Sequence, residues 1–382
     1  MNFRTAAKVA LAAVCAVAFS ACNDLQQILQ PDPPQSGGEI AVGVVMSITG
    51  DGASAGEREL NGMELAREEV NSSQLAGMSI RFIIEDSESD PTVAVEAFNK
   101  LIHEDNVSVI LGPGFSSSAR VAFPIAQENQ VVALSPSAGA AGLGAIGDYV
   151  FRIPTPANVY SRSLIQQTKE KLGYQRVAAI FDNADFFSQS GHDEAVKALE
   201  ELGVDLAAVE PFETGETDFT GHLNNIKNAN PDAIIVSTRP VERVAIPIQA
   251  RELGIPDTIP LIVLGFSSAH VELAGDAAEG IITGSTWSKH ADSPGNQAFI
   301  QNYRAKYGVE PDGFAAGGYT TVQVLAAALR DAGSTDSAAI RDALAAIDTP
   351  TIAGQFTFDS NGDPNTPVFI TIVENGDLRI LD

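Results

Sequence analysis

The sequence has few cysteines, few histidines and few basic residues, and each scarcity excludes a class of protein. Only Cys15 and Cys22 occur among the 382 residues, so neither a disulfide framework nor a cysteine-based zinc site is expected. The five histidines fall at no metal-ligand spacing, and neither a metal nor another cofactor is predicted. With 49 acidic against 23 basic residues, the formal net charge of −26 argues against nucleic acid as a partner.

Long apolar runs are missing except at the N-terminus. Arg4 and Lys8 precede an apolar run at residues 9–19. This run is shorter than the roughly 20 residues that are needed to span a bilayer. A positive start followed by such a run is typical of a secretory signal peptide, which we place at residues 1–21. No other segment is apolar enough to cross a membrane.

The signal ends in "FSAC", which resembles the lipobox of bacterial lipoproteins. In that motif the cysteine, here Cys22, becomes the lipidated first residue of the mature chain. The alternative is an ordinary secretory signal cleaved after Ala21. Residues 22–39 contain "PDPPQSGG" and indicate a flexible tether between the lipid and the folded part.

From Ile40 onward, continuous apolar runs alternate with stretches of helical periodicity, a pattern typical of parallel strands covered by helices on both faces. The expected strands fall into two sets, at residues 40–49, 79–86, 107–113 and 131–136, and at 176–182, 204–212, 232–238, 259–265 and 280–286. Three helical stretches and two terminal strands, 354–364 and 367–381, follow. We therefore predict an α/β protein with two doubly wound parallel sheets, in which the chain returns to the first lobe before crossing again.

Motifs for catalysis are missing. The serines of "LGPGFSSSAR" do not form a nucleophile elbow, because Ser116 lacks the flanking G-x-S-x-G pattern. No stretch fits a Walker A loop or a dinucleotide-binding glycine motif. "DSNGDP" (359–364) indicates a turn, since it lacks the closing glutamate of a calcium loop. An enzyme is not predicted, and an exported serine hydrolase is the weakest alternative.

Small polar residues instead follow two strands of the first set. Ser116 stands where a strand leads into a helix, and the positive end of a helix dipole favours an anion such as a carboxylate. "LSPSAGA" (134–140), with Ser137, Ala138 and Gly139, follows the next strand and exposes backbone. Open α/β sheets bind ligands at such carboxyl ends of strands. The alternative is that Ser116 or Ser117 only caps the helix.

Several stretches, in order and at matching spacing, resemble the type I periplasmic solute-binding proteins of branched-chain amino acid ABC transporters. They include "DSESDPTVAVEAFNKLI", "VILGPGFSSSARVAFPIAQENQVVALSPSAGA", "VFRIPTPANVYSRSL", "AAEGIITGSTW" and "GGYTTVQVLAAAL". The resemblance implies two lobes joined by three hinge crossovers: residues 40–155 plus 286–354, and residues 156–285 plus 355–382.

The resemblance also implies a function. The chain would capture an amino acid or a related small carboxylate between its lobes and deliver it to an ABC permease. It would act outside the cytoplasm as a monomer, touching the membrane only through its lipid. The alternative is a ligand-sensing module that reports to a membrane receptor without transport, because one fold serves both uses.

In the first lobe, the resemblance implies that the Ser116 hydroxyl and amide bind the ligand carboxylate, and that the Ser137 carbonyl receives its ammonium. Gly139 replaces a threonine common at that position, and Ala138 lies between the two. Phe314 matches an aromatic residue bordering the side-chain pocket, with a core role as the alternative.

In the second lobe, Phe186 falls at an aromatic position that closes on the ligand, with Phe187 as the alternative in register. Arg239, or Thr238 beside it, stands where leucine binders carry tyrosine, and an arginine there favours a second carboxylate. Ser267 replaces the glutamate that pairs with the ammonium. Either another acid, such as Asp185, takes that role, or the ligand is not a simple α-amino acid.

Overall fold

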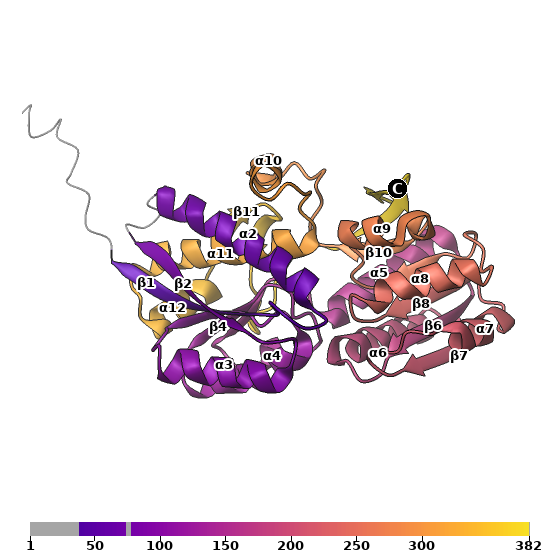
Figure 1. The fold of residues 1–382 in the computed structure, drawn as a ribbon, viewed down its shortest axis with the longest axis horizontal. Coiled ribbons are helices and arrows are strands. Elements are labelled where there is room, and N and C mark those ends of the chain that lie inside the picture. Colours follow the sequence, from indigo (N-terminus) through magenta and orange to yellow (C-terminus); the bar gives the residue numbers. More distant parts are fainter. Residues whose placement is uncertain (1–37, 74–77, 382) are drawn as a thin grey trace, which may run out of the picture.

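The computed structural model describes residues 38–73 and 78–381, which form two lobes side by side (Figure 1). The predicted signal peptide and the predicted lipidation residue Cys22 lie outside the described residues. Among the helices that the structure describes, none is both long and apolar enough to cross a membrane.

The first lobe is built on a parallel sheet with the strand order β2-β1-β3-β4-β5. Buried aliphatic side chains on both faces of the central strands explain the continuous apolar runs of the sequence. The strands are β1 (Glu39–Met46), β2 (Ser79–Asp86), β3 (Val109–Leu111), β4 (Val132–Ser135) and β5 (Val150–Arg152).

Helices cover both faces of this first sheet, as Figure 1 shows on the left of the molecule. One face carries α3 (Pro91–His103) and α4 (Ser116–Glu128). The other face carries α2 (Ala53–Ser72) and three helices that come late in the chain, α10 (Asn296–Tyr307), α11 (Gly313–Ala332) and α12 (Ser337–Ala345). The chain therefore returns to the first lobe after completing most of the second.

The second lobe has a seven-stranded sheet with the order β14-β13-β10-β9-β8-β6-β7. Its first five strands along the chain are parallel to one another. The sixth runs antiparallel to the fifth, and the seventh antiparallel to the sixth. They are β6 (Arg176–Asp182), β7 (Asp205–Phe212), β8 (Ala233–Ser237), β9 (Leu261–Val263), β10 (Ile282–Ser285), β13 (Phe369–Glu374) and β14 (Asp377–Ile380). On one face lie α5 (Ala157–Leu172) and α6 (Phe186–Glu201), and on the other α7 (Thr220–Asn228), α8 (Glu242–Glu252) and α9 (Ser268–Ala274).

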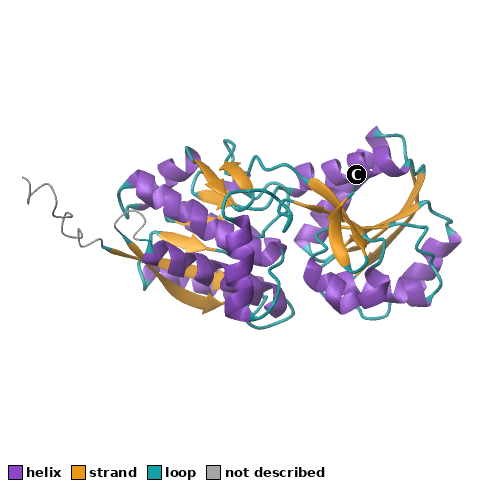
Figure 2. Cartoon of the chain, turned by 90° about the horizontal axis from the view of Figure 1, so that it is seen from above, coloured by secondary structure: helices purple, strands orange, loops and turns teal. Residues whose placement is uncertain are grey.

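The lobes are joined by three irregular segments, after β5, after β10 and before β13, which run as loops between the two groups of strands (Figure 2). The predicted class, two doubly wound parallel-sheet lobes, is confirmed.

The predicted change of lobe between residues 354 and 355 is too early. Residues of β12 (Gly354–Thr357) pair with β11 (Asp348–Thr351), and the rings of Phe356 and Phe358 are buried in the first lobe. The chain leaves this lobe only after Phe358. The two predicted terminal strands consequently lie in different lobes, and the final hairpin is β13 with β14.

Candidate functional site

A cavity of about 210 Å³ lies between the lobes, at the carboxyl ends of their parallel strands. Both lobes and two of the crossovers contribute side chains to its wall. Six of the eight predicted binding residues line it, namely Ser116, Ser137, Gly139, Arg239, Ser267 and Phe314. Ala138 and Phe186 do not. Contact with a ligand remains a prediction for all of them.

The N-terminus of α4 opens onto this cavity without a capping side chain. The residue at the N-cap is Phe115, and no side chain accepts a hydrogen bond from the first turn, so the alternative of serine capping is wrong. Ser116 is buried, and its hydroxyl oxygen accepts a bond from the Ala140 amide at 3.0 Å. Its own proton is therefore free for an acceptor in the cavity. Uncapped amides at the positive end of a helix suit an anion.

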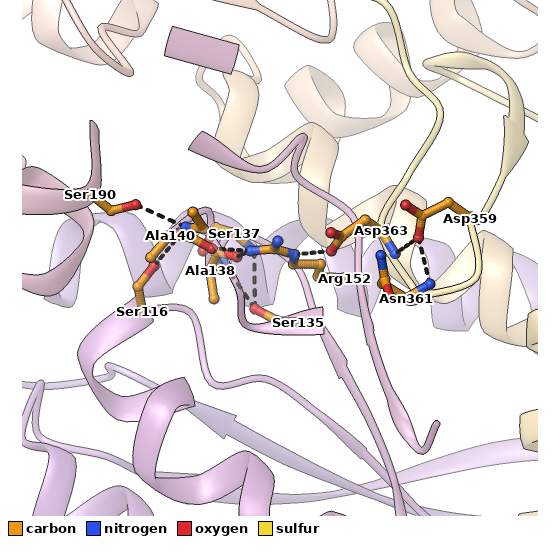
Figure 3. A network of polar contacts seen from close by, with 11 residues as sticks. Ser116, Ser135, Ser137, Ala138, Ala140, Arg152, Ser190, Asp359, Asn361 and Asp363 are labelled. Carbon is orange, nitrogen blue, oxygen red and sulfur yellow. Dashed lines mark hydrogen bonds and ion pairs between the residues drawn. The ribbon is translucent and has the colours of Figure 1, made fainter. Parts of the chain in front are cut away.

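The loop of residues 136–140 is held in place by a buried arginine (Figure 3). Arg152, at the end of β5, is fully buried and donates from Nη1 to the carbonyls of Ala138 and Ala140. Its Nε bonds to Asp363 Oδ1 at 2.5 Å, in the crossover that precedes β13. Arg152 thus connects the loop beside the cavity to a segment that joins the lobes. The buried Ala138 serves this contact and presents no surface to the cavity.

Asp363 is itself fixed by a compact turn, which is what "DSNGDP" was predicted to form. Asp359 Oδ1 accepts bonds from the amides of Asn361, at 2.8 Å, and of Asp363, at 3.0 Å (Figure 3). The turn orients Asp363 toward Arg152. The role of the turn in this structure is therefore to hold the Arg152–Asp363 ion pair at the crossover.

Glu59, on α2, is a buried carboxyl group in the cavity wall that sequence reasoning missed. The Ser137 hydroxyl donates to its Oε1. Burial raises the pKa of Glu59 to about 8, and the neighbouring Asp312 carboxyl adds to this, while the bond from Ser137 acts in the opposite direction. The signal was present in the sequence, because Glu59 occupies the helical stripe of Gly56, Met63 and Ala66, where an apolar residue is expected.

The protonation of Glu59 predicts a pH-dependent stability. In the folded protein it holds a proton up to about pH 8, whereas the unfolded chain loses it near 4.5, so this group lowers stability as pH rises between those values. The slope is at most about 1.4 kcal/mol per pH unit. Glu59→Gln, which mimics the neutral form, is expected to lose this slope in urea unfolding measured across the same range. Equal slopes for the variant and the parent would contradict the assignment.

Of the two neighbouring phenylalanines in the second lobe, Phe187 is the one that lines the cavity. Its ring lines the cavity and would meet a Cβ on Gly139 at 3.1 Å, which explains why a larger residue is missing at that position. Phe186 turns away, packs beside the α3–α4 core and lies 5.0 Å below the guanidinium of Arg120. Consecutive residues on a helix differ in direction by about 100°, so only one of the pair faces the cavity.

Arg239 joins the two lobes. Its Nη2 lies 2.5 Å from Asp51 Oδ1 in the first lobe, and its guanidinium stacks 4.7 Å from the ring centroid of Phe115. Thr238 is buried and does not line the cavity. The predicted role of Arg239 as the receptor of a second carboxylate does not suit this arrangement, because its charge is already paired with Asp51.

Ser267 also links the lobes. Burial lowers the pKa of His270 to about 3, so the neutral ring accepts a bond from the Ser267 amide at 2.9 Å. The Ser267 hydroxyl donates to Asp312 in the first lobe at 3.3 Å. Asp185 lines the cavity, but its Oδ1 accepts bonds from the Ser188 amide and hydroxyl as the cap of α6. Of the carboxyls in the cavity wall, Glu59 is thus better placed than Asp185 to meet an ammonium.

Arg243, one helical turn after Arg239, is the second residue that sequence reasoning missed. It is 5% exposed, lines the cavity, and donates from Nη1 to the Gly265 carbonyl at 3.0 Å. Its cation lies 5.6 Å from the ring centroid of Phe187. Burial lowers the pKa of Arg243 to about 10, which leaves the side chain charged at neutral pH.

A family model for periplasmic binding proteins matches residues 39–377. The chain belongs to the periplasmic binding protein family. This binding protein is similar to the leucine-, isoleucine-, valine-, threonine- and alanine-binding protein of Pseudomonas aeruginosa, with 26% identity over 328 residues, 85% of this chain and 87% of the relative. The predicted resemblance is confirmed, and the family is one of solute-binding proteins rather than enzymes.

Solved structures agree with this assignment. The binding protein is similar to a leucine-binding protein, LivK, of Thermotoga maritima, with a TM-score of 0.84, 27% identity and coverage of 90% of this chain and 98% of that one. It is also similar to the substrate-binding protein LivJ of Streptococcus pneumoniae in complex with isoleucine, with a TM-score of 0.82, 29% identity and coverage of 89% and 97%.

Proposed function

We propose that this binding protein captures a small carboxylate between its two lobes and hands it to an ABC permease in the membrane. The observation that carries this proposal is the uncapped N-terminus of α4, with the Ser116 hydroxyl beside it, in a cavity walled by both lobes. A carboxylate there would accept bonds from the helix amides and the hydroxyl. Contacts from both lobes would stabilise the closed arrangement over the open one.

The relatives favour an amino acid as one class of ligand, since several of them are leucine-, isoleucine- and valine-binding proteins. The ammonium of such a ligand would meet Glu59, which would then release its proton. Within the same proposal, Cys22 carries lipid and tethers the protein to a membrane outside the cytoplasm. Mass spectrometry of the mature N-terminus tests this part, because an unmodified chain beginning at Cys22 would exclude the anchor.

Ser116→Ala tests the carboxylate site. A thermal-shift panel of leucine, glutamate, glutarate and benzoate first identifies which probes raise the melting temperature. For the strongest probe, calorimetry is expected to show binding weakened by about 1–3 kcal/mol, the worth of a hydrogen bond to a charged group. Ser117→Ala is the matched control, because Ser117 is the next residue on α4 and does not line the cavity. Equal affinity of Ser116→Ala and the parent would remove Ser116 from the site.

A further inference from the structure

Arg243 is a buried cation without an ion-pair partner among the described residues. Two arginines in the described part of the chain are buried, Arg152 and Arg243, and only Arg152 has a carboxylate within reach, that of Asp363. Arg243 gives one hydrogen bond to a carbonyl, and its Nε has no partner. Asp185 and Glu242 act on its charge only from beyond ion-pair distance.

The surroundings fix the guanidinium at the cavity wall. Gly265 adopts a φ of +73°, and a Cβ there would come within 3.1 Å of the Arg243 Cζ, so glycine allows the backbone to approach the guanidinium. The ring centroid of Phe187 lies 5.6 Å from the guanidinium. A buried guanidinium without a counter-ion is costly, and its planar donors match the two oxygens of a carboxylate.

Phe187 lies near both Arg243 and the loop that is bonded to Ser116. Its ring meets Gly139, in the loop bonded to Ser116, and also contacts the Arg243 guanidinium. Ser116 belongs to the first lobe and Arg243 to the second, and both line one cavity. The cavity therefore has two positions for negative charge, one on each lobe.

We infer that Arg243 binds a second anionic group, so that the ligand of this protein is a small dicarboxylate held at the α4 N-terminus by one end and at Arg243 by the other. This inference rests on the proposed function. The charges agree with it, because Arg239 is paired with Asp51, whereas no described carboxylate lies within ion-pair distance of Arg243. The neutral Glu59 adds no opposing negative charge to the cavity at pH 7.

Two matched ligand pairs test the inference on the unaltered protein. Glutamate is compared with glutamine, and glutarate with butyrate, so that each pair differs in one carboxylate. The dianionic member is expected to bind roughly 10- to 100-fold more tightly by calorimetry, as for charge-assisted hydrogen bonds in a buried site. Monocarboxylates that bind as tightly as their dianionic partners would overturn the inference and leave the proposed function standing. If no small carboxylate raised the melting temperature, the proposed function itself would fail.

Variants then assign the preference to its residue. Arg243→Met is expected to lose most of the preference for the dianionic partner while keeping the affinity for the monocarboxylate. The control is Arg251→Met on the same helix, because Arg251 donates to the Ile255 and Pro256 carbonyls away from the cavity. If Arg243→Met does not fold, Arg243→Lys keeps the charge without the planar fork and should reduce the preference. An undiminished preference in either Arg243 variant would contradict the assignment.

Discussion

Arg152→Met is expected to cost the folded protein about 3–5 kcal/mol and to weaken ligand binding, because removing one partner of a buried ion pair leaves the other charge uncompensated. Asp363 would keep its charge beside an apolar side chain, and the carbonyls of Ala138 and Ala140 would lose their donor. These carbonyls belong to the loop that also carries Ser137, so the cavity wall should loosen together with the crossover. Urea unfolding measures the stability, and calorimetry with the strongest probe measures binding.

Arg176→Met is the matched control for this loss. Arg176 also pairs with an aspartate, Asp205, but both side chains are about half exposed, and exposed pairs contribute about 0–1 kcal/mol. Asp363→Asn should fall between the two, since the amide oxygen still accepts a bond from Arg152. A loss in Arg152→Met no larger than that in Arg176→Met would show that the network does not hold the loop.

Gly62→Val is expected to destabilise the protein by about 3 kcal/mol, at the upper end for overpacking a core. A Cβ on Gly62 would stand 2.0 Å from the Ala315 carbonyl oxygen, and one on Gly318 would stand 2.0 Å from that of Glu59. Helices α2 and α11 therefore cross in backbone contact at glycines. Since the obstacle is backbone and not a flexible side chain, the helices must move apart, and Glu59 moves with α2. Urea unfolding measures the loss.

Gly221→Ala provides the contrast, because Gly221 lies on α7 with open space around its Cα. Alanine there should be neutral or should stabilise by up to about 1 kcal/mol, through its better helix propensity. A comparable loss in both variants would indicate that helix conformation, and not the α2–α11 contact, determines the effect.

The two parallel sheets, though not the order of their strands, followed from the sequence because buried parallel strands leave a continuous apolar signature. The turn at residues 359–364 was predictable because aspartate, asparagine, glycine and proline favour turns. The position of the last crossover was not predictable from the sequence. The register of β12 depends on its pairing with β11, and the burial of Phe356 and Phe358 depends on the core of the first lobe. Strand pairing is a tertiary property that apolar patterning within one segment does not specify.

The parts of the site that are defined by the backbone were predictable from the sequence. The parts that depend on the direction of a side chain were less predictable. Ser116 lies at a strand-to-helix junction, which local pattern reveals. The pairing of Arg239 was not predictable, because its partner Asp51 is 188 positions away in the chain. The choice between Phe186 and Phe187 depends on where α6 begins, and one residue changes the direction of the side chain.

The bonds that the two lobes make to each other also affect how quickly a ligand leaves. Arg239 with Asp51, Ser267 with Asp312, and the Ala141 amide with the Ser190 hydroxyl, at 2.9 Å, join the lobes through protein atoms alone. In the proposed function the lobes must part before a bound molecule leaves, so these bonds would lengthen its residence time. Weakening the Arg239–Asp51 pair would thus speed release.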